Sequence, residues 1–220
     1  MYDRNDSPVP VRAALGLAIA YVWIYLLLLA IGAAAAARAQ YVFGLVPAVI
    51  TGRATLTTGL DVLPPTSTLL TAPFLHDSAL GVLGVLFYLW VFAPPVEAAL
   101  GAWRFVVLAL AAGVCAGLAQ TVALPLAMEP VLGARGVVSA VLGAHLLLLP
   151  RARWTLPFEL GRYRPGIPTV LLTLVWFALP VLRALTGTAM QPTWAGDAGG
   201  FVCGLVLVLF LKRRDARLFA

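Results

Sequence analysis

The sequence predicts an all-α polytopic membrane protein, a bundle of six transmembrane helices with both termini in the cytoplasm. Of its 220 residues, 62% are hydrophobic and only 11% are charged, and the mean hydropathy is +0.97. These values lie far outside the range of soluble proteins. Six apolar stretches follow one another and leave no separate soluble domain; they cover residues 13–37, 78–93, 105–128, 136–149, 168–187 and 194–211.

The first, third and fifth stretches are long enough to cross a hydrocarbon core of about 30 Å unaided. No cleavage-like site follows the first stretch, so we expect an uncleaved anchor helix rather than a signal peptide. The second and sixth stretches are somewhat shorter, at residues 78–93 and 194–211. Together the six stretches form one membrane domain over residues 13–211, between tails over residues 1–12 and 212–220.

The fourth stretch has only 14 apolar residues, Gly136 to Leu149. A helix of that length spans about 21 Å, about 9 Å less than the hydrocarbon core. The preceding segment, residues 130–134, must therefore descend into the membrane. Non-helical backbone is tolerated at that depth only where it is buried in protein or lines a watery cavity. We expect a cavity open to the outside, with Arg135 at its floor.

The distribution of Lys and Arg orients the chain, because cytoplasmic segments carry an excess of basic residues. With the N-terminus inside, eleven of the 15 basic residues fall on the cytoplasmic side: Arg4, Arg12, Arg104, Arg151, Arg153, Arg162, Arg164, Lys212, Arg213, Arg214 and Arg217. The other side holds Arg38, Arg53, Arg135 and Arg183. Both tails are therefore expected in the cytoplasm. The net charge of +6 reflects this bias and the anionic inner leaflet, not binding of nucleic acid. The use of Arg and Ala suggests a bacterial cell (inner) membrane.

Two opposite charges lie near the outer starts of the fourth and sixth stretches, Arg135 and Asp197. Each precedes the last apolar residue of its stretch by 14 residues, so both lie about 21 Å above the inner boundary, and they are level if the two helices are parallel. A cation is disfavoured at a helix N-terminus and costly inside a bilayer. We expect an Arg135–Asp197 ion pair. Two other uses stay open: Asp197 caps its own helix, or Arg135 holds a lipid phosphate or a substrate carboxylate.

Small residues recur at every fourth position in both of these helices. The fourth stretch carries Gly136, Ala140 and Ala144, and the sixth carries Gly196, Gly200 and Gly204. Such stripes let helices pack backbone to backbone in lipid. We therefore expect the two helices to be in close contact. Tryptophans near the ends of the stretches, including Trp176 and Trp194, are expected to be interfacial anchors, and Trp194 also has a position suited to the cavity mouth.

Several motifs occur in an order and spacing that resemble the rhomboids, a family of six-helix intramembrane serine proteases. The similarity runs from about residue 41 to 212. The motifs are residues 41–47 (YVFGLVP), 74–76 (FLH), 96–97 (VE), 100–105 (LGAWRF), 133–136 (GARG), 141–144 (VLGA), 150–153 (PRAR) and 199–201 (GGF) with Gly204. The resemblance identifies Glu97, Gly101, Trp103 and Arg104 as the family's loop motif between the second and third helices. We expect Glu97 and Arg104 to fix loop backbone there.

The resemblance implies a catalytic Ser in the fourth helix and a catalytic His in the sixth. Those positions are Arg135 and Asp197 in this chain. It also implies a His and an Asn in the second helix that support the oxyanion, where this chain has Gly81 and Val85; only His76 is retained. These four substitutions indicate a pseudoprotease. The expected Arg135–Asp197 ion pair then takes the place of the catalytic dyad and closes the site.

Ser139 is the only substitute nucleophile in reach, because it lies one helical turn from Arg135 on the same face. A nucleophilic hydroxyl needs a base within hydrogen-bonding distance. His145 lies too deep, about 15 Å beyond Arg135, and His76 would have to reach past Arg135. We expect Ser139 to bond back to the carbonyl of residue 135. The chain has no His-Glu-x-x-His motif, so neither a metal nor a cofactor is expected.

The leading functional prediction is a protein that binds transmembrane segments of client proteins without cleaving them. The resemblance implies a lateral opening between the second and fifth helices, and Pro180 and Gly187 are compatible with bending of the fifth. The expected partners are client segments, the lipid bilayer and a second copy or an active relative, but no nucleic acid. One alternative is an active intramembrane serine endopeptidase. The other is a small transporter or lipid-handling protein, for which the chain lacks an inverted repeat.

Overall fold

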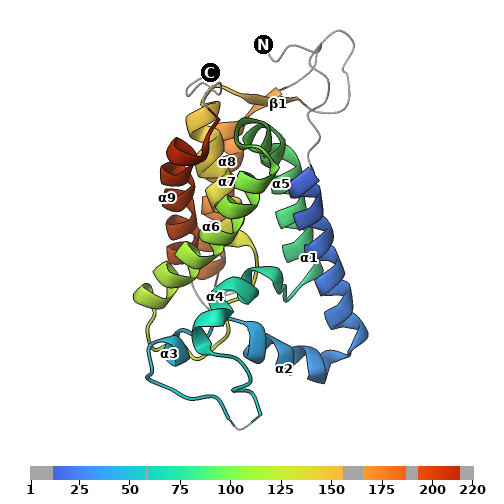
Figure 1. Ribbon diagram of the computed structural model, residues 1–220, viewed down its shortest axis with the longest axis vertical. Coiled ribbons are helices and arrows are strands. Elements are labelled where there is room, and N and C mark those ends of the chain that lie inside the picture. Colours follow the sequence, from blue (N-terminus) through green and yellow to red (C-terminus); the bar gives the residue numbers. More distant parts are fainter. Residues whose placement is uncertain (1–11, 58, 156–165, 187–192, 214–220) are drawn as a thin grey trace.

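The computed structural model describes residues 12–57, 59–155, 166–186 and 193–213. Most of the tails expected at residues 1–12 and 212–220, together with Arg162, Arg164 and Gly187, lie outside the described residues. The described chain is mostly helical, and its long helices run side by side (Figure 1). Four are long and apolar enough to cross a membrane: α1 (Arg12–Ala30), α5 (Ala79–Leu100), α6 (Ala102–Ala123) and α9 (Trp194–Leu211). Two shorter apolar helices accompany them, α7 (Arg135–Leu148) and α8 (Thr169–Leu185).

The two ends of the molecule carry different kinds of structure (Figure 1). At one end lie α2 (Ala33–Phe43), α3 (Pro47–Ile50), α4 (Thr68–Thr71) and the 3₁₀ turns η1 (Pro65–Ser67) and η2 (Ala72–Phe74). At the other end lie two antiparallel strands, β1 (Arg153–Thr155) and β2 (Gly166–Pro168), with Trp154 opposite Ile167. The strands were not expected for an all-α chain. Aromatic and β-branched residues favour such pairing, but three residues are too few to show an alternating pattern.

The first apolar stretch, residues 13–37, is not one helix as the sequence predicted. Helix α1 ends at Ala30, and Gly32, with φ 85°, turns the chain into α2, which lies across the end of α1 (Figure 1). Only glycine adopts this conformation without steric cost. The second stretch is longer than its apolar run: α5 continues through Pro94 and Pro95 to Leu100.

Glu97 and Arg104 tie the ends of two other helices to the α5–α6 turn. The Glu97 carboxylate, 2% exposed, accepts hydrogen bonds from the backbone N–H groups of Ala13 (2.9 Å) and Ala14 (2.8 Å) at the start of α1. Arg104 Nη1 donates to the carbonyl of Leu211 at the end of α9 (3.2 Å). A carboxylate at a helix N-terminus and a cation at a C-terminus both suit the helix dipole. The partners are therefore helix ends rather than the loop backbone that we expected.

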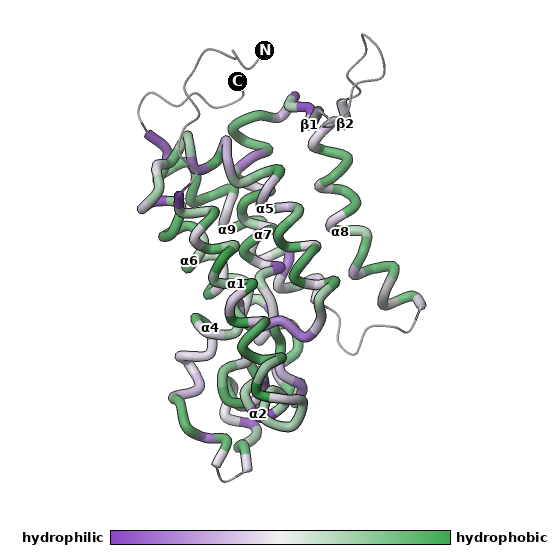
Figure 2. Tube along the Cα trace, turned by 90° about the vertical axis from the view of Figure 1, so that its right-hand side faces the viewer, coloured by the Kyte–Doolittle hydropathy of each residue, from purple (hydrophilic) through white to green (hydrophobic). Residues whose placement is uncertain are grey.

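Helices α6, α7 and α9 pack with their backbones in contact. A Cβ atom on Gly200 would overlap the backbone of Gly136, and one on Gly204 would overlap the backbone of Ala140. Gly136 also lies so close to α6 that an added Cβ would overlap the side chain of Ala116. Because the contacts advance together along α7 and α9, these two helices are parallel. Figure 2 shows α8 at the side of this group, diverging from it toward its C-terminal end.

Candidate functional site

Arg135 and Asp197 form an ion pair between the first turns of α7 and α9. Arg135 Nη2 lies 2.7 Å from Asp197 Oδ2, and Nε lies 3.2 Å from both carboxylate oxygens. The Asp197 side chain is 1% exposed and that of Arg135 is 24% exposed. Hydrogen bonds between two charged groups are the strong ones. The parallel packing of α7 and α9 brings the two residues to one level.

The Asp197 carboxylate faces Arg135 and does not cap its own helix. The N-cap residues of α7 and α9 are Ala134 and Thr193, and neither end has a side-chain cap. Asp197 still lies in the first turn of α9, where a negative charge suits the positive end of the helix dipole. The positive end of the α7 dipole disfavours the charge of Arg135. The Asp197 carboxylate compensates for this unfavourable interaction.

Trp176 of α8 completes the site. Its indole N–H donates to Ser139 Oγ (2.9 Å), and its carbonyl accepts from Arg135 Nη2 (3.4 Å). The guanidinium carbon of Arg135 lies 4.4 Å from the centre of the indole ring, a cation–π arrangement. Trp176 is only 3% exposed, so the expectation of an interfacial anchor was wrong for this residue. Because 41 residues separate Trp176 from Arg135, no local sequence pattern could have joined them.

Ser139 is fully buried and engaged. Its oxygen accepts the hydrogen bond of Trp176 Nε1 (2.9 Å), and its hydroxyl lies near the Asp197 carboxylate. The sequence placed Ser139 on the face of Arg135 but did not identify the indole as its partner. A hydroxyl in this setting is a structural link between α7, α8 and α9.

The two histidines lie away from Ser139. The His76 ring, 4% exposed, packs edge-on against Tyr21 of α1, with ring centres 5.3 Å apart. Burial lowers the pKa of His76, and the backbone of Phe74 and the carboxylate of Asp77 offset part of this shift. His145 packs edge-on against Phe92 of α5, with ring centres 4.9 Å apart. Neither imidazole is a hydrogen-bond partner of Ser139 in the part of the chain that the structure describes.

The positions expected to support an oxyanion offer no polar side chain. The Gly81 N–H donates to Ser78 Oγ (3.2 Å), which caps the start of α5. Val85, 2% exposed, belongs to the apolar core. Within the described ranges, no group of three or more His, Cys, Asp or Glu side chains is placed to hold a metal ion.

A cavity of about 50 Å³ lies beside the ion pair, and Arg135, Asp197, Gln120 and Thr193 contribute to its lining. This volume has room for a few water molecules but not for a peptide segment. Gln120 Oε1 accepts the N–H of Gly196 (3.0 Å), a link between α6 and α9 that the sequence did not reveal.

The non-helical segment before α7 is held by other parts of the protein. Leu45 and Val131 exchange two backbone hydrogen bonds (3.2 and 2.7 Å), and Gly133 N–H donates to the carbonyl of Ala72 (3.1 Å). Irregular backbone at membrane depth needs such partners. These contacts meet that condition with protein groups.

A family model described as a rhomboid domain matches residues 65–214, more than half of the chain. The matched range contains all the site residues described above except Leu45, which bonds to Val131, and Tyr21, which packs against His76. No curated protein matches the chain.

Proposed function

Because this chain belongs to the rhomboid family, we propose that it is a membrane protein that binds transmembrane segments of client proteins without cleaving them. The observation that carries this proposal is the Arg135–Asp197 ion pair. It occupies the two positions at which the family resemblance implies the catalytic Ser and His. A guanidinium is not a nucleophile, and a carboxylate that binds it is poorly placed to act as a base.

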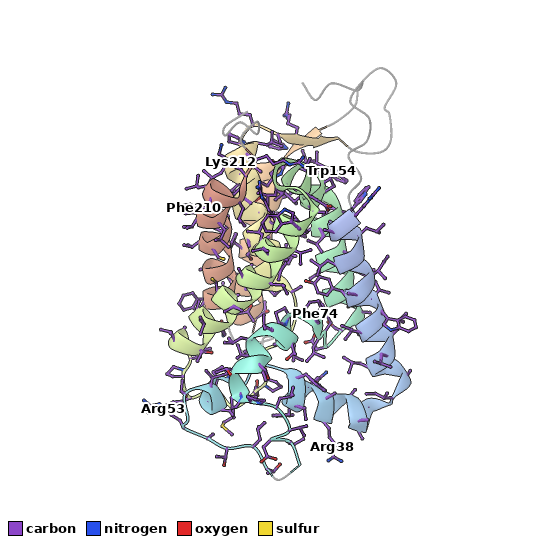
Figure 3. The ribbon with its side chains drawn as sticks, viewed as in Figure 1. Arg38, Arg53, Phe74, Trp154, Phe210 and Lys212 are labelled. Atoms are coloured by element: carbon purple, nitrogen blue, oxygen red, sulfur yellow. The ribbon has the colours of Figure 1, made fainter. Side chains whose placement is uncertain are left out.

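We further propose that α1, α5, α6, α7, α8 and α9 all cross the membrane, with both termini in the cytoplasm of a bacterial cell. Basic residues support this orientation. The structure places Arg12, Arg104, Arg153 and Lys212 near the β1–β2 end, whereas Arg38 and Arg53 lie at the α2–α3 end (Figure 3). Cytoplasmic ends carry the excess of Lys and Arg.

Clients are proposed to enter between α5 and α8. Among the described residues, few polar and aromatic side-chain contacts hold α8. Besides the contacts of Trp176 with Ser139 and Arg135, Tyr88 of α5 donates a hydrogen bond to the carbonyl of Leu172 (3.0 Å), and its ring centre lies 4.5 Å from that of Trp176. Pro180 interrupts the hydrogen-bond ladder of α8. A helix held by so few contacts can move at low cost. A second copy or an active relative is the other proposed partner of the same surface.

The absence of cleavage is tested with purified protein reconstituted together with a single-span substrate and a serine-reactive fluorophosphonate probe. We expect neither cleavage products nor labelling. One observation favours the second candidate, an active serine endopeptidase: the Ser139 hydroxyl neighbours the Asp197 carboxylate. Labelling of the wild type that is lost in Ser139→Ala would establish that candidate and reject ours.

Binding is tested by placing a photo-cross-linking amino acid at Phe87 of α5, which is 37% exposed and packs against Tyr88. The matched control is Val122 of α6, which is 80% exposed. A panel of tagged single-span proteins is reconstituted with each variant. We expect intact, uncleaved adducts at Phe87 that an excess of untagged segment suppresses. Equal adducts at Val122 would show random encounter in the bilayer and contradict the proposal.

A further inference from the structure

A second, larger cavity lies at the α2–α3 end of the molecule. Its volume is about 500 Å³, ten times that of the cavity beside Arg135. The seventeen lining residues that the structure describes fall between Tyr41 and Thr68, and all but two of them precede residue 65, where the family match begins. The family match therefore reaches only the edge of this cavity, although residues 41–47, four of which line it, form one of the motifs that resemble the family.

The cavity is lined mainly by apolar side chains. Ten of its seventeen lining residues are Val, Ile, Leu or Pro, among them Val42, Val49, Ile50, Leu56 and Leu60. Apolar cavities do not retain ordered water, because water finds no partners there. The volume falls within the range of about 300–1,000 Å³ that is typical of pockets for small molecules. In a membrane protein, the abundant apolar molecule that can fill such a space is a lipid acyl chain.

The cavity lies at the end of a helix that is long and apolar enough to cross a membrane. Helix α2 follows directly on the membrane-spanning α1 and lies across its end (Figure 1). Tyr41 and Phe43 at the C-terminal end of α2 are 36% and 40% exposed. Aromatic side chains on a helix in this position are typical of the membrane–water interface.

Two arginines give the cavity rim a positive charge. Arg53 lies between the lining residues Gly52 and Ala54. Arg38 Nη2 lies 3.9 Å from the position that a Cβ atom would take on Gly59, which directly precedes the lining residues Leu60 and Asp61. Both arginines are exposed, and their side chains point away from the helical bundle (Figure 3). Among the described lining residues, Asp61 is the one acidic residue, and its Oδ1 accepts the N–H of Gly59 (3.2 Å).

We propose that this cavity binds an acyl chain of a phospholipid with an anionic headgroup, and that the positive charge of Arg38 and Arg53 attracts its phosphate. Two arginines against one aspartate leave a net positive rim, which favours a lipid of net negative charge. Arginine also matches the geometry of phosphate oxygens. Arg12 and Arg213, the first and last residues that the structure describes, lie at the end of the molecule opposite to this cavity. This site is separate from Arg135 and Asp197, so it does not depend on the proposed client binding.

The test uses the full-length protein reconstituted in nanodiscs of equal parts phosphatidylglycerol and phosphatidylcholine. The protein is released into mild detergent, and the retained lipid is identified by native mass spectrometry. We expect one retained phospholipid, with phosphatidylglycerol at least tenfold over phosphatidylcholine. Val49→Trp and Ala54→Trp, which fill the cavity, should each lower retention at least tenfold. Leu80→Trp, at an 80% exposed position of α5 outside the cavity, is the matched control and should retain lipid like the wild type.

The headgroup is tested separately with Arg38→Ala combined with Arg53→Ala. This variant should keep one lipid but lose the preference for phosphatidylglycerol. An unchanged preference would overturn the assignment of the phosphate to these arginines. Retention in Val49→Trp equal to that in Leu80→Trp, or a retained peptide in place of lipid, would overturn the acyl-chain site.

A photo-reactive lipid applied to the wild type keeps the test valid if the cavity-filling variants fail to fold. Phosphatidylglycerol with a diazirine in its acyl chain is cross-linked in the nanodisc, and the labelled peptides are sequenced. Labelling enriched within residues 41–68 supports the proposal. Labelling spread evenly over the exposed faces of α1, α5 and α9 contradicts it.

Discussion

Helices α7 and α9 are joined through their backbones, whereas α8 is joined to them through a few side chains. Gly200 and Gly204 of α9 leave no space for a Cβ atom against α7. By contrast, α8 depends on Trp176, which binds Ser139 and Arg135, and on Phe177, whose ring packs edge-on against Phe201. Truncating one side chain of α9 leaves the backbone contact along the helix in place, whereas truncating the Trp176 indole removes most of the polar contacts of α8 described here. We call Arg135, Asp197, Ser139 and Trp176 the charged cluster. Its fixed side is the backbone contact of α7 with α9, and its releasable side is the side-chain contact with α8.

The largest effect is expected where the backbones touch. In Gly204→Leu the new side chain has to occupy the space of the Ala140 backbone, so α9 must separate from α7. Overpacking of this kind costs ~3 kcal/mol or more. We expect loss of monodisperse protein in detergent, measured by size-exclusion chromatography. The control is Gly84→Leu in α5, where an added Cβ atom meets nothing within 4 Å; a similar loss there would show that the packing of α7 on α9 is not the cause.

The ion pair is the next strongest link between α7 and α9. Removing one member of a buried pair strands a charge and costs ~3–5 kcal/mol, while replacing both is far less costly. Arg135→Ala and Asp197→Ala should therefore each lower the free energy of unfolding in bicelles, and the double variant should recover most of it. We expect a coupling of at least ~1 kcal/mol in the double-mutant cycle, above the additivity limit of independent sites. Strictly additive losses would mean that the two charges do not stabilise each other.

A substitution of Trp176 affects the contact of α8 but not the contact between α7 and α9. Trp176→Leu removes the hydrogen bond to Ser139, worth ~1 kcal/mol, and the contact with the Arg135 guanidinium, worth ~0.5–2 kcal/mol. We expect faster amide hydrogen exchange in α8, with little change in α9. Trp90→Leu, at a 60% exposed position of α5, is the matched control. Equal acceleration in α8 and α9 would contradict the distinction between a fixed and a releasable side.

The smallest effect on stability is expected from a change of pH. It concerns the part of the protein around the start of α7. His76 lies against Gly133, close to the start of α7. Because burial lowers its pKa below the usual 6.5, the unfolded chain binds a proton at a higher pH than the folded one. Stability is therefore complete above pH 6.5 and falls as the pH drops from 6.5 toward the lowered pKa. We expect unfolding measurements between pH 4.5 and 8 to show this loss in the wild type and a reduced loss in His76→Phe. Identical profiles would show that His76 stays neutral or does not titrate on unfolding.

The resemblance to rhomboids could be recognised from motifs alone and is confirmed by the family match. The sequence also predicted that Arg135 and Asp197 lie at the same height along their helices. The rise per residue of a helix is constant, and each charge lies the same number of residues from the end of its helix. The repeated glycines predicted which helices approach, since only small residues permit contact between backbones. These are properties of single helices, and a sequence records them directly.

Other features depend on contacts between distant segments. Trp176 was expected at the membrane interface, because its position near a span end says nothing about the hydroxyl and guanidinium that its indole meets. Glu97 was expected to hold its own loop, yet it caps α1, 83 residues earlier in the chain. The break at Gly32 and the β1–β2 pair were missed, because neither interrupts the apolar pattern strongly enough. The sequence alone thus determined the membrane class and the family, and it predicted that Arg135 and Asp197 lie level with each other. Only the tertiary structure decided the partners of each buried polar group, because those partners come from whichever helices pack side by side.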